Sequence, residues 1–89
     1  MNAEILKKAR KLKERGFYVV TSIKEKTTGN VGTASLVDED VWVKLLGEDN
    51  CREEFFVSME EFNQAFEIIM IDLDTGRDSV RYKPNEFLM

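Results

Sequence analysis

The residues of this chain that could do chemistry are carboxylates near its C-terminal end, because histidine is absent and cysteine occurs once. Asp72, Asp74 and Asp78 surround a Thr-Gly step. Carboxylates can act as general acid and base when their environments separate their pKa values. The lack of imidazole excludes Ser-His-Asp and Cys-His catalysis and the common Cys/His zinc sites. No glycine-rich phosphate loop is present either, so we expect a non-enzymatic protein with no catalytic residue, metal or cofactor.

The string Asp74-Thr75-Gly76 resembles the Asp-Thr-Gly signature of the retroviral-type aspartic proteases. The resemblance implies that Asp74 is a catalytic acid in a dimer whose two aspartates share one proton. It covers only the eight residues 73–80, and such a motif needs its structural context. The thirteen residues after Gly76 are too few for the flap and dimer sheet of that family. Because Asp, Thr and Gly are also common in turns, we expect a hairpin turn at 74–78.

Residues 68–74 also resemble the apolar strand ending in Asp-x-Asp of phosphatases of the haloacid dehalogenase type. The resemblance implies phosphoryl chemistry at Asp72 and Asp74. Those phosphatases carry Gly and then Thr after the second aspartate, whereas this chain has Thr and then Gly. A carboxylate enzyme built on Asp72, Asp74 and Asp78 is therefore the third hypothesis, behind two binding hypotheses.

The size and composition of the chain describe one globular domain, residues 1–89, with 43% hydrophobic and 34% charged side chains. No apolar run is long enough to cross a bilayer, and no signal-peptide pattern follows the basic N-terminus. The lone cysteine, Cys51, suits a reducing compartment. We expect a cytoplasmic protein, or one of the host cytoplasm if a phage or another mobile element encodes it.

The hydrophobic periodicity predicts an α+β fold: an N-terminal helix, a four-stranded antiparallel meander, a second helix and a short C-terminal hairpin or strand. Asn2 is the expected N-cap of the first helix and Gly16 its stop. Ser58 and Glu61 form a capping-box pattern that starts the second helix, whose apolar spacing continues to Ile69. The predicted ranges are 3–15 for the first helix, 17–25, 31–37, 41–46 and 52–57 for the meander, 68–73 for a return to strand, and 79–83 for the last strand.

Charge divides the chain in two, because residues 1–15 sum to +4 and the remainder to −8. Such an asymmetry of charge gives information about binding partners rather than about the fold. Bases on one face of the first helix give the alternative hypothesis, a nucleic-acid-binding protein whose cations contact phosphates. The pI near 4.8 weighs against it, because nucleic-acid modules are usually basic. The bases concerned are Lys7, Lys8, Lys11 and Arg15.

Three aromatic residues, Tyr18, Trp42 and Phe56, fall on strand faces opposite the main apolar stripes. Either the two helices cover one face each, or both pack on one face and leave these aromatics open to a partner. The second arrangement gives the leading hypothesis, a small acidic protein–protein interaction module that acts as a regulator or inhibitor. Its partner would be a protein with a basic surface, such as a nucleic-acid-handling protein, with a homodimer left open and no membrane contact. The acids expected to steer that partner are Asp38, Glu39, Asp40, Glu48 and Asp49.

Overall fold

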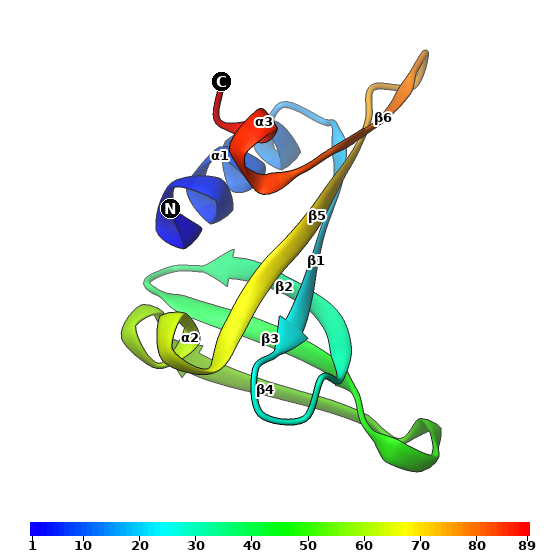
Figure 1. The fold of residues 1–89 in the computed structure, drawn as a ribbon. Coiled ribbons are helices and arrows are strands. Elements are labelled where there is room, and N and C mark those ends of the chain that lie inside the picture. Colours follow the sequence, from blue (N-terminus) through cyan, green and yellow to red (C-terminus); the bar gives the residue numbers. More distant parts are fainter.

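The computed structural model describes residues 1–89, apart from the side chain of Glu48. Within this range the strands form one antiparallel sheet with the order β4-β3-β2-β1-β5-β6. Figure 1 shows α1 and α3 together near both termini, with α2 at the other end of β5. The elements are α1 Asn2–Glu14, β1 Tyr18–Glu25, β2 Val31–Val37, β3 Asp40–Leu46, the 3-10 turn η1 Glu48–Asn50, β4 Arg52–Ser58, α2 Met59–Ala65, β5 Phe66–Asp74, β6 Ser79–Tyr82 and α3 Pro84–Phe87.

The α+β class, the N-terminal helix, the second helix and the meander β1 to β4 are confirmed, but the four-stranded count is wrong. The C-terminal hairpin is part of the same sheet, which has six strands. β5 lies beside β1, with Thr21 opposite Ile71, and β6 pairs with β5. The reason is that a strand has two hydrogen-bonding edges: β2 pairs with one edge of β1, and β5 satisfies the other.

The first helix differs from the prediction at its start. Met1 is the N-cap and makes no side-chain hydrogen bond, so the expected Asn2 cap is wrong. The apolar stripe is as expected, because Ile5, Leu6 and Ala9 are buried. Gly16 follows the helix with φ +95°, a conformation that glycine adopts without strain.

The second helix begins as predicted, and its end, which the sequence left open, is at Ala65. The Oγ of Ser58 accepts a hydrogen bond from the backbone N–H of Glu61 at 3.1 Å, which confirms the cap. The helix does not follow the apolar spacing to Ile69, because the backbone is already extended at Phe66. β5 skips one residue against β1, since Ser22 pairs with Met70 and Ile23 with Ile68. Ile69 is therefore the extra residue of a β-bulge, and its apparent helical position is a coincidence of spacing.

A short third helix closes the chain and was not expected. Pro84 ends the hairpin as predicted, and it also begins α3. Glu86 Oε1 accepts a hydrogen bond from the backbone N–H of Lys83 at 3.0 Å. The buried ring of Phe87 meets Tyr82 edge to face, with centroids 5.7 Å apart, and this contact fixes α3 on β6.

All three helices contribute to one apolar core. Buried residues alternate with less buried ones along β1 and β3, so we infer that the core lies on a single face of the sheet. Ile5 comes from α1, Phe62 from α2 and Phe87 from α3. Because side chains alternate along a strand, the residue directly before or after a core position faces the other way. This arrangement decides between the two packing alternatives: the helices share one side, and the opposite sheet face stays open. Core strand residues are Val19, Ile23, Ala34, Val41, Val43, Leu45, Phe66, Ile68 and Ile71.

Among the described residues, no helix combines the length and apolar character needed to cross a membrane.

Candidate functional site

The open sheet face carries a stacked pair of aromatic rings. Trp42 of β3 stands opposite Phe56 of β4, with ring centroids 6.1 Å apart and planes inclined by 16°. Neighbouring Val41 and Val43 are buried in the core, so alternation forces Trp42 to the other side. Phe56 is 60% exposed. Together with exposed Val37 these rings line a shallow hollow of about 380 Å³, which we call the aromatic face (Val37, Trp42 and Phe56).

Charged residues border the aromatic face. The Nζ of Lys44 lies 4.4 Å from the centroid of the Trp42 ring and 3.9 Å from Glu54 Oε1. This cation therefore contacts the indole and a carboxylate at once. Asp40 pairs with Val37 across β2 and β3, which places an exposed acid beside the aromatic face.

Tyr18 does not join the other two aromatics. It is 69% exposed and lies at the start of β1, opposite Asp74 of β5. β2 separates β1 from β3 in the sheet, so Tyr18 and Trp42 stand on different strands with a third between them. The structure thus brings together two of the three predicted contact aromatics.

The predicted steering acids lie in two turns at opposite ends of β3. Asp38 and Glu39 form the β2–β3 turn, where Asp38 has φ 54° and its carbonyl oxygen accepts a hydrogen bond from Arg10 Nη1 at 3.1 Å. Asp49 is in the η1 turn between β3 and β4, with φ 62°. The side chain of Glu48 lies outside the described part of the structure. Only the first group therefore adjoins the aromatic face.

The basic face of α1 is partly used inside the protein. The Nζ of Lys8 donates to the carbonyl oxygen of Phe87 and lies 4.7 Å from the centroid of that ring. Lys8 thereby attaches α3 to α1. The other three bases of the nucleic-acid hypothesis, Lys7, Lys11 and Arg15, are exposed.

The Asp-Thr-Gly string forms the predicted hairpin turn. Asp74 Oδ1 accepts a hydrogen bond from the backbone N–H of Gly76 at 2.8 Å, and Gly76 has φ +88°. Asp72 accepts one from Arg81 Nε, also at 2.8 Å. This hydrogen bond and the charge of Asp72 raise the pKa of Arg81 above its ordinary value. Both carboxylates therefore have local structural partners. Among the described residues, no group of three or more His, Cys, Asp or Glu side chains is arranged to hold a metal ion.

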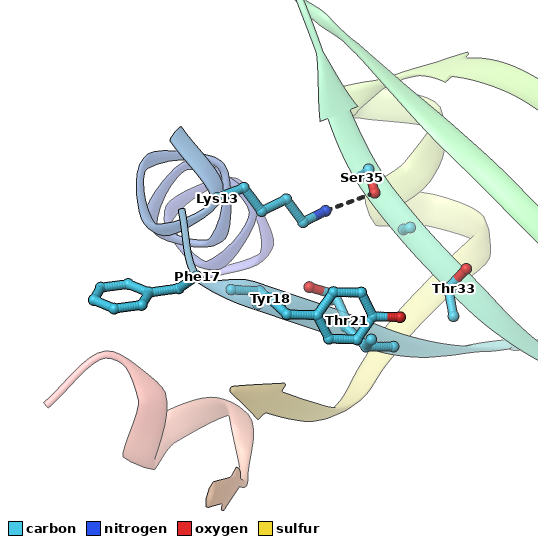
Figure 2. Close-up of a pocket in the computed structure, with 9 residues that line it drawn as sticks. Lys13, Phe17, Tyr18, Thr21, Thr33 and Ser35 are labelled. Atoms are coloured by element: carbon cyan, nitrogen blue, oxygen red, sulfur yellow. Dashed lines mark hydrogen bonds between the residues drawn. The ribbon is translucent and has the colours of Figure 1, made fainter. Parts of the chain in front are cut away.

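A second site, which the sequence did not indicate, lies between β1 and β2. These strands pair only where residues 22–24 meet residues 31–33, and beyond that they diverge around a cleft of about 310 Å³. Lys13 enters it from α1, and its Nζ donates a hydrogen bond to the Oγ of Ser35 at 3.0 Å (Figure 2). We call this the β1–β2 cleft. Its polar lining residues are Lys13, Tyr18, Thr21, Thr33 and Ser35.

The polar groups of the β1–β2 cleft are unusual in two respects. Burial lowers the pKa of the Lys13 ammonium, and the nearby charge of Lys44 lowers it further. Thr21 is 1% exposed, and its Oγ1 is buried without a hydrogen-bond partner. The only sign of this cleft in the sequence is a set of hydroxyl residues in otherwise apolar strands. That pattern does not indicate a cleft until the divergence of the two strands is known.

By its fold this protein is a small α+β domain. Its helices all pack on one face of a six-stranded antiparallel sheet. No protein-family model matches the chain, and neither a curated protein nor a solved structure matches it.

Proposed function

We propose that this protein is a non-enzymatic protein–protein interaction module, a regulator or inhibitor, that binds its partner through the aromatic face. The observation that carries the proposal is the stacked Trp42–Phe56 pair on the sheet face without helices. Tryptophan is enriched among the residues that dominate binding energy in interfaces. An exposed apolar patch bordered by polar residues is typical of a contact surface.

The backbone holds this surface ready for binding. Trp42 and Phe56 belong to paired strands, so their Cα positions are fixed by the sheet ladder. Each ring also restricts the rotamers of the other through the stack. Because little side-chain freedom remains to be lost, association through these rings carries a small entropic cost.

The charges of the nearest turn favour a basic partner. Asp38, Glu39 and Asp40 lie at the end of the β2–β3 hairpin beside Val37. Exposed acids at the rim of an apolar centre accelerate encounter with a basic surface and contribute less to final affinity. A protein that handles nucleic acid presents such a surface. A cytoplasmic location is part of the proposal, supported by the single exposed thiol, Cys51.

The experiment is capture of partners from the source cell by tagged wild-type protein, followed by affinity measurement with the purified partner. Trp42→Ala and Phe56→Ala should each weaken binding by about tenfold or more while the circular dichroism of the free domain is retained. Tyr18→Ala is the control, an aromatic residue about as exposed as Phe56 that lies outside the aromatic face. Unchanged affinity of both folded variants refutes the proposed surface.

A second candidate is nucleic-acid binding through α1. The exposure of Lys7, Lys11 and Arg15 favours it, whereas the use of Lys8 against Phe87 and the net charge of −4 oppose it. Titration of duplex and single-stranded DNA at low salt is the test, because phosphate contacts weaken steeply as salt rises. Absence of binding at low salt removes this candidate.

A further inference from the structure

We propose that the β1–β2 cleft binds the oxyanion group, carboxylate or phosphate, of a small ligand, with Lys13 as its cation. The cleft lies beside the aromatic face, since Ser35 pairs with Trp42 across β2 and β3, but the two sites share no lining residue. The inference does not depend on the proposed function. The cleft is open enough to admit a ligand, and its volume of about 310 Å³ lies at the lower end of the range for ligand pockets. A small molecule fits such a space, whereas a folded partner does not.

Hydrogen-bond donors converge on the cleft from two strands and a helix. Lys13 carries three ammonium protons, and Ser35 Oγ accepts one of them. The hydroxyl residues Tyr18, Thr33 and Ser35 line the same space (Figure 2). Each can donate to an oxyanion, and hydrogen bonds to a charged acceptor are stronger than those between neutral groups.

The hydroxyl of Thr21, which has no hydrogen-bond partner within the protein, is the most specific feature of the cleft. Buried polar groups nearly always have a hydrogen-bond partner, and an isolated one lowers stability. Thr21 is the most buried of the polar residues that line the cleft, and its Oγ1 has none. A ligand with acceptor oxygens in this cleft provides the missing partner.

The electrostatic surroundings favour an anion, although the protein as a whole is acidic. None of the described residues that line the cleft is a carboxylate. Lys44 of β3 is close enough for its charge to lower the pKa of Lys13, so two ammonium groups repel each other here. Lys44 contacts Glu54 at the exposed surface, and on α1 Glu14 pairs with Arg10 at 3.3 Å. A bound anion relieves this repulsion between the two ammonium groups.

The test is an NMR titration of the isotopically labelled full chain with inorganic phosphate and, separately, with succinate, at constant ionic strength in chloride. We expect saturable shifts at the amides of Tyr18, Thr21, Thr33 and Ser35, and a rise in the pKa of Lys13 on binding. Lys13→Met should weaken the affinity by about tenfold or more, since a charged hydrogen-bonding group is lost. Lys24→Met, at an exposed lysine of β1 outside the cleft, should bind as wild type.

Thr21→Val provides a second test, because a purely structural role of Thr21 would not change anion binding. It should weaken anion binding while leaving the free protein equally stable or more stable, because the partnerless hydroxyl is removed at nearly constant volume. Saturation by only one probe supports the proposal and assigns the ligand to the phosphate or the carboxylate class. Shifts that never saturate, or that are the same in wild type and Lys13→Met, overturn it.

Discussion

Trp42 and Phe56 face each other across β3 and β4 with their ring centroids 6.1 Å apart, on the side of the sheet opposite the helices. Their chain neighbours Val43 and Phe55 form the next pair in the register, and Val43 is fully buried on the core side. One pair of strands therefore serves two purposes. Its inner side contributes to the core, and its outer side presents the surface that we propose for a partner.

The aromatic pair should contribute modestly to stability. Trp42→Ala, Phe56→Ala and the double variant form a cycle whose coupling energy we expect to be about 0.5–1.5 kcal/mol, as for other aromatic pairs. Urea unfolding followed by circular dichroism measures it. All three variants should remain folded, because neither ring is in the core. Unfolding by Trp42→Ala alone contradicts this placement.

Phe62 should be among the most sensitive positions of the chain. It is fully buried, and its ring stacks on Phe66 with centroids 5.4 Å apart. Phe62→Ala removes this stack and leaves a cavity, so we expect a loss of about 3–5 kcal/mol in the free energy of unfolding. Phe56→Ala is the control of identical chemistry at an exposed site. Equal losses of unfolding free energy for the two substitutions would contradict the placement of Phe62 in the core and of Phe56 at the surface.

Gly32 allows β2 to pass very close to β3. A Cβ at this position would lie 2.0 Å from the backbone oxygen of Lys44, a contact that no side-chain rotation relieves. Gly32→Ala must shift the strand pair, and we expect a destabilisation of about 1–3 kcal/mol or more. Gly47→Ala is the matched control, since its nearest contact is an ordinary 3.5 Å. Thermal unfolding of both variants tests this, and similar melting temperatures contradict it.

The cap at Ser58 should be measurable on its own. Ser58→Ala removes the acceptor for the backbone N–H of Glu61 and should lower the free energy of unfolding by about 1 kcal/mol. Ser79→Ala, at an exposed serine of β6, should have little effect. Denaturant titrations of both variants give the comparison, and an unchanged midpoint for Ser58→Ala shows that the cap is dispensable.

Lys13 should make stability depend on pH in the alkaline range. Because its pKa is lowered in the folded protein, the unfolded chain binds more protons between that value and the ordinary 10.5. The contribution of Lys13 to stability therefore increases as the pH rises through this interval. Lys13→Met lacks the increase, so the difference in unfolding free energy between wild type and variant should change over the same interval. A difference that is constant with pH rules out a lowered pKa.

Local chemistry made several features predictable. The bounds of β2 agree with the expected range 31–37, and Ser58 caps α2 as its spacing to Glu61 indicates. The turn at 74–78 was also predictable from local contacts, since Asp74 accepts a hydrogen bond from the backbone N–H of Gly76 within the hairpin. The end of α2 was not predictable, because Ile68 and Ile69 fit a helical spacing as well as a strand. The pairing of β5 with β1 is what ends the helix.

The sequence by itself determined which residues alternate. It placed Trp42 and Phe56 opposite the apolar stripes of their strands, because side chains of a strand point to the two faces in turn. Only the tertiary structure decided which face is covered, since that depends on where three separate helices find a shared core. It also separated Tyr18 from the other aromatics and opened the β1–β2 cleft, because strand divergence is set by packing between segments distant in the chain.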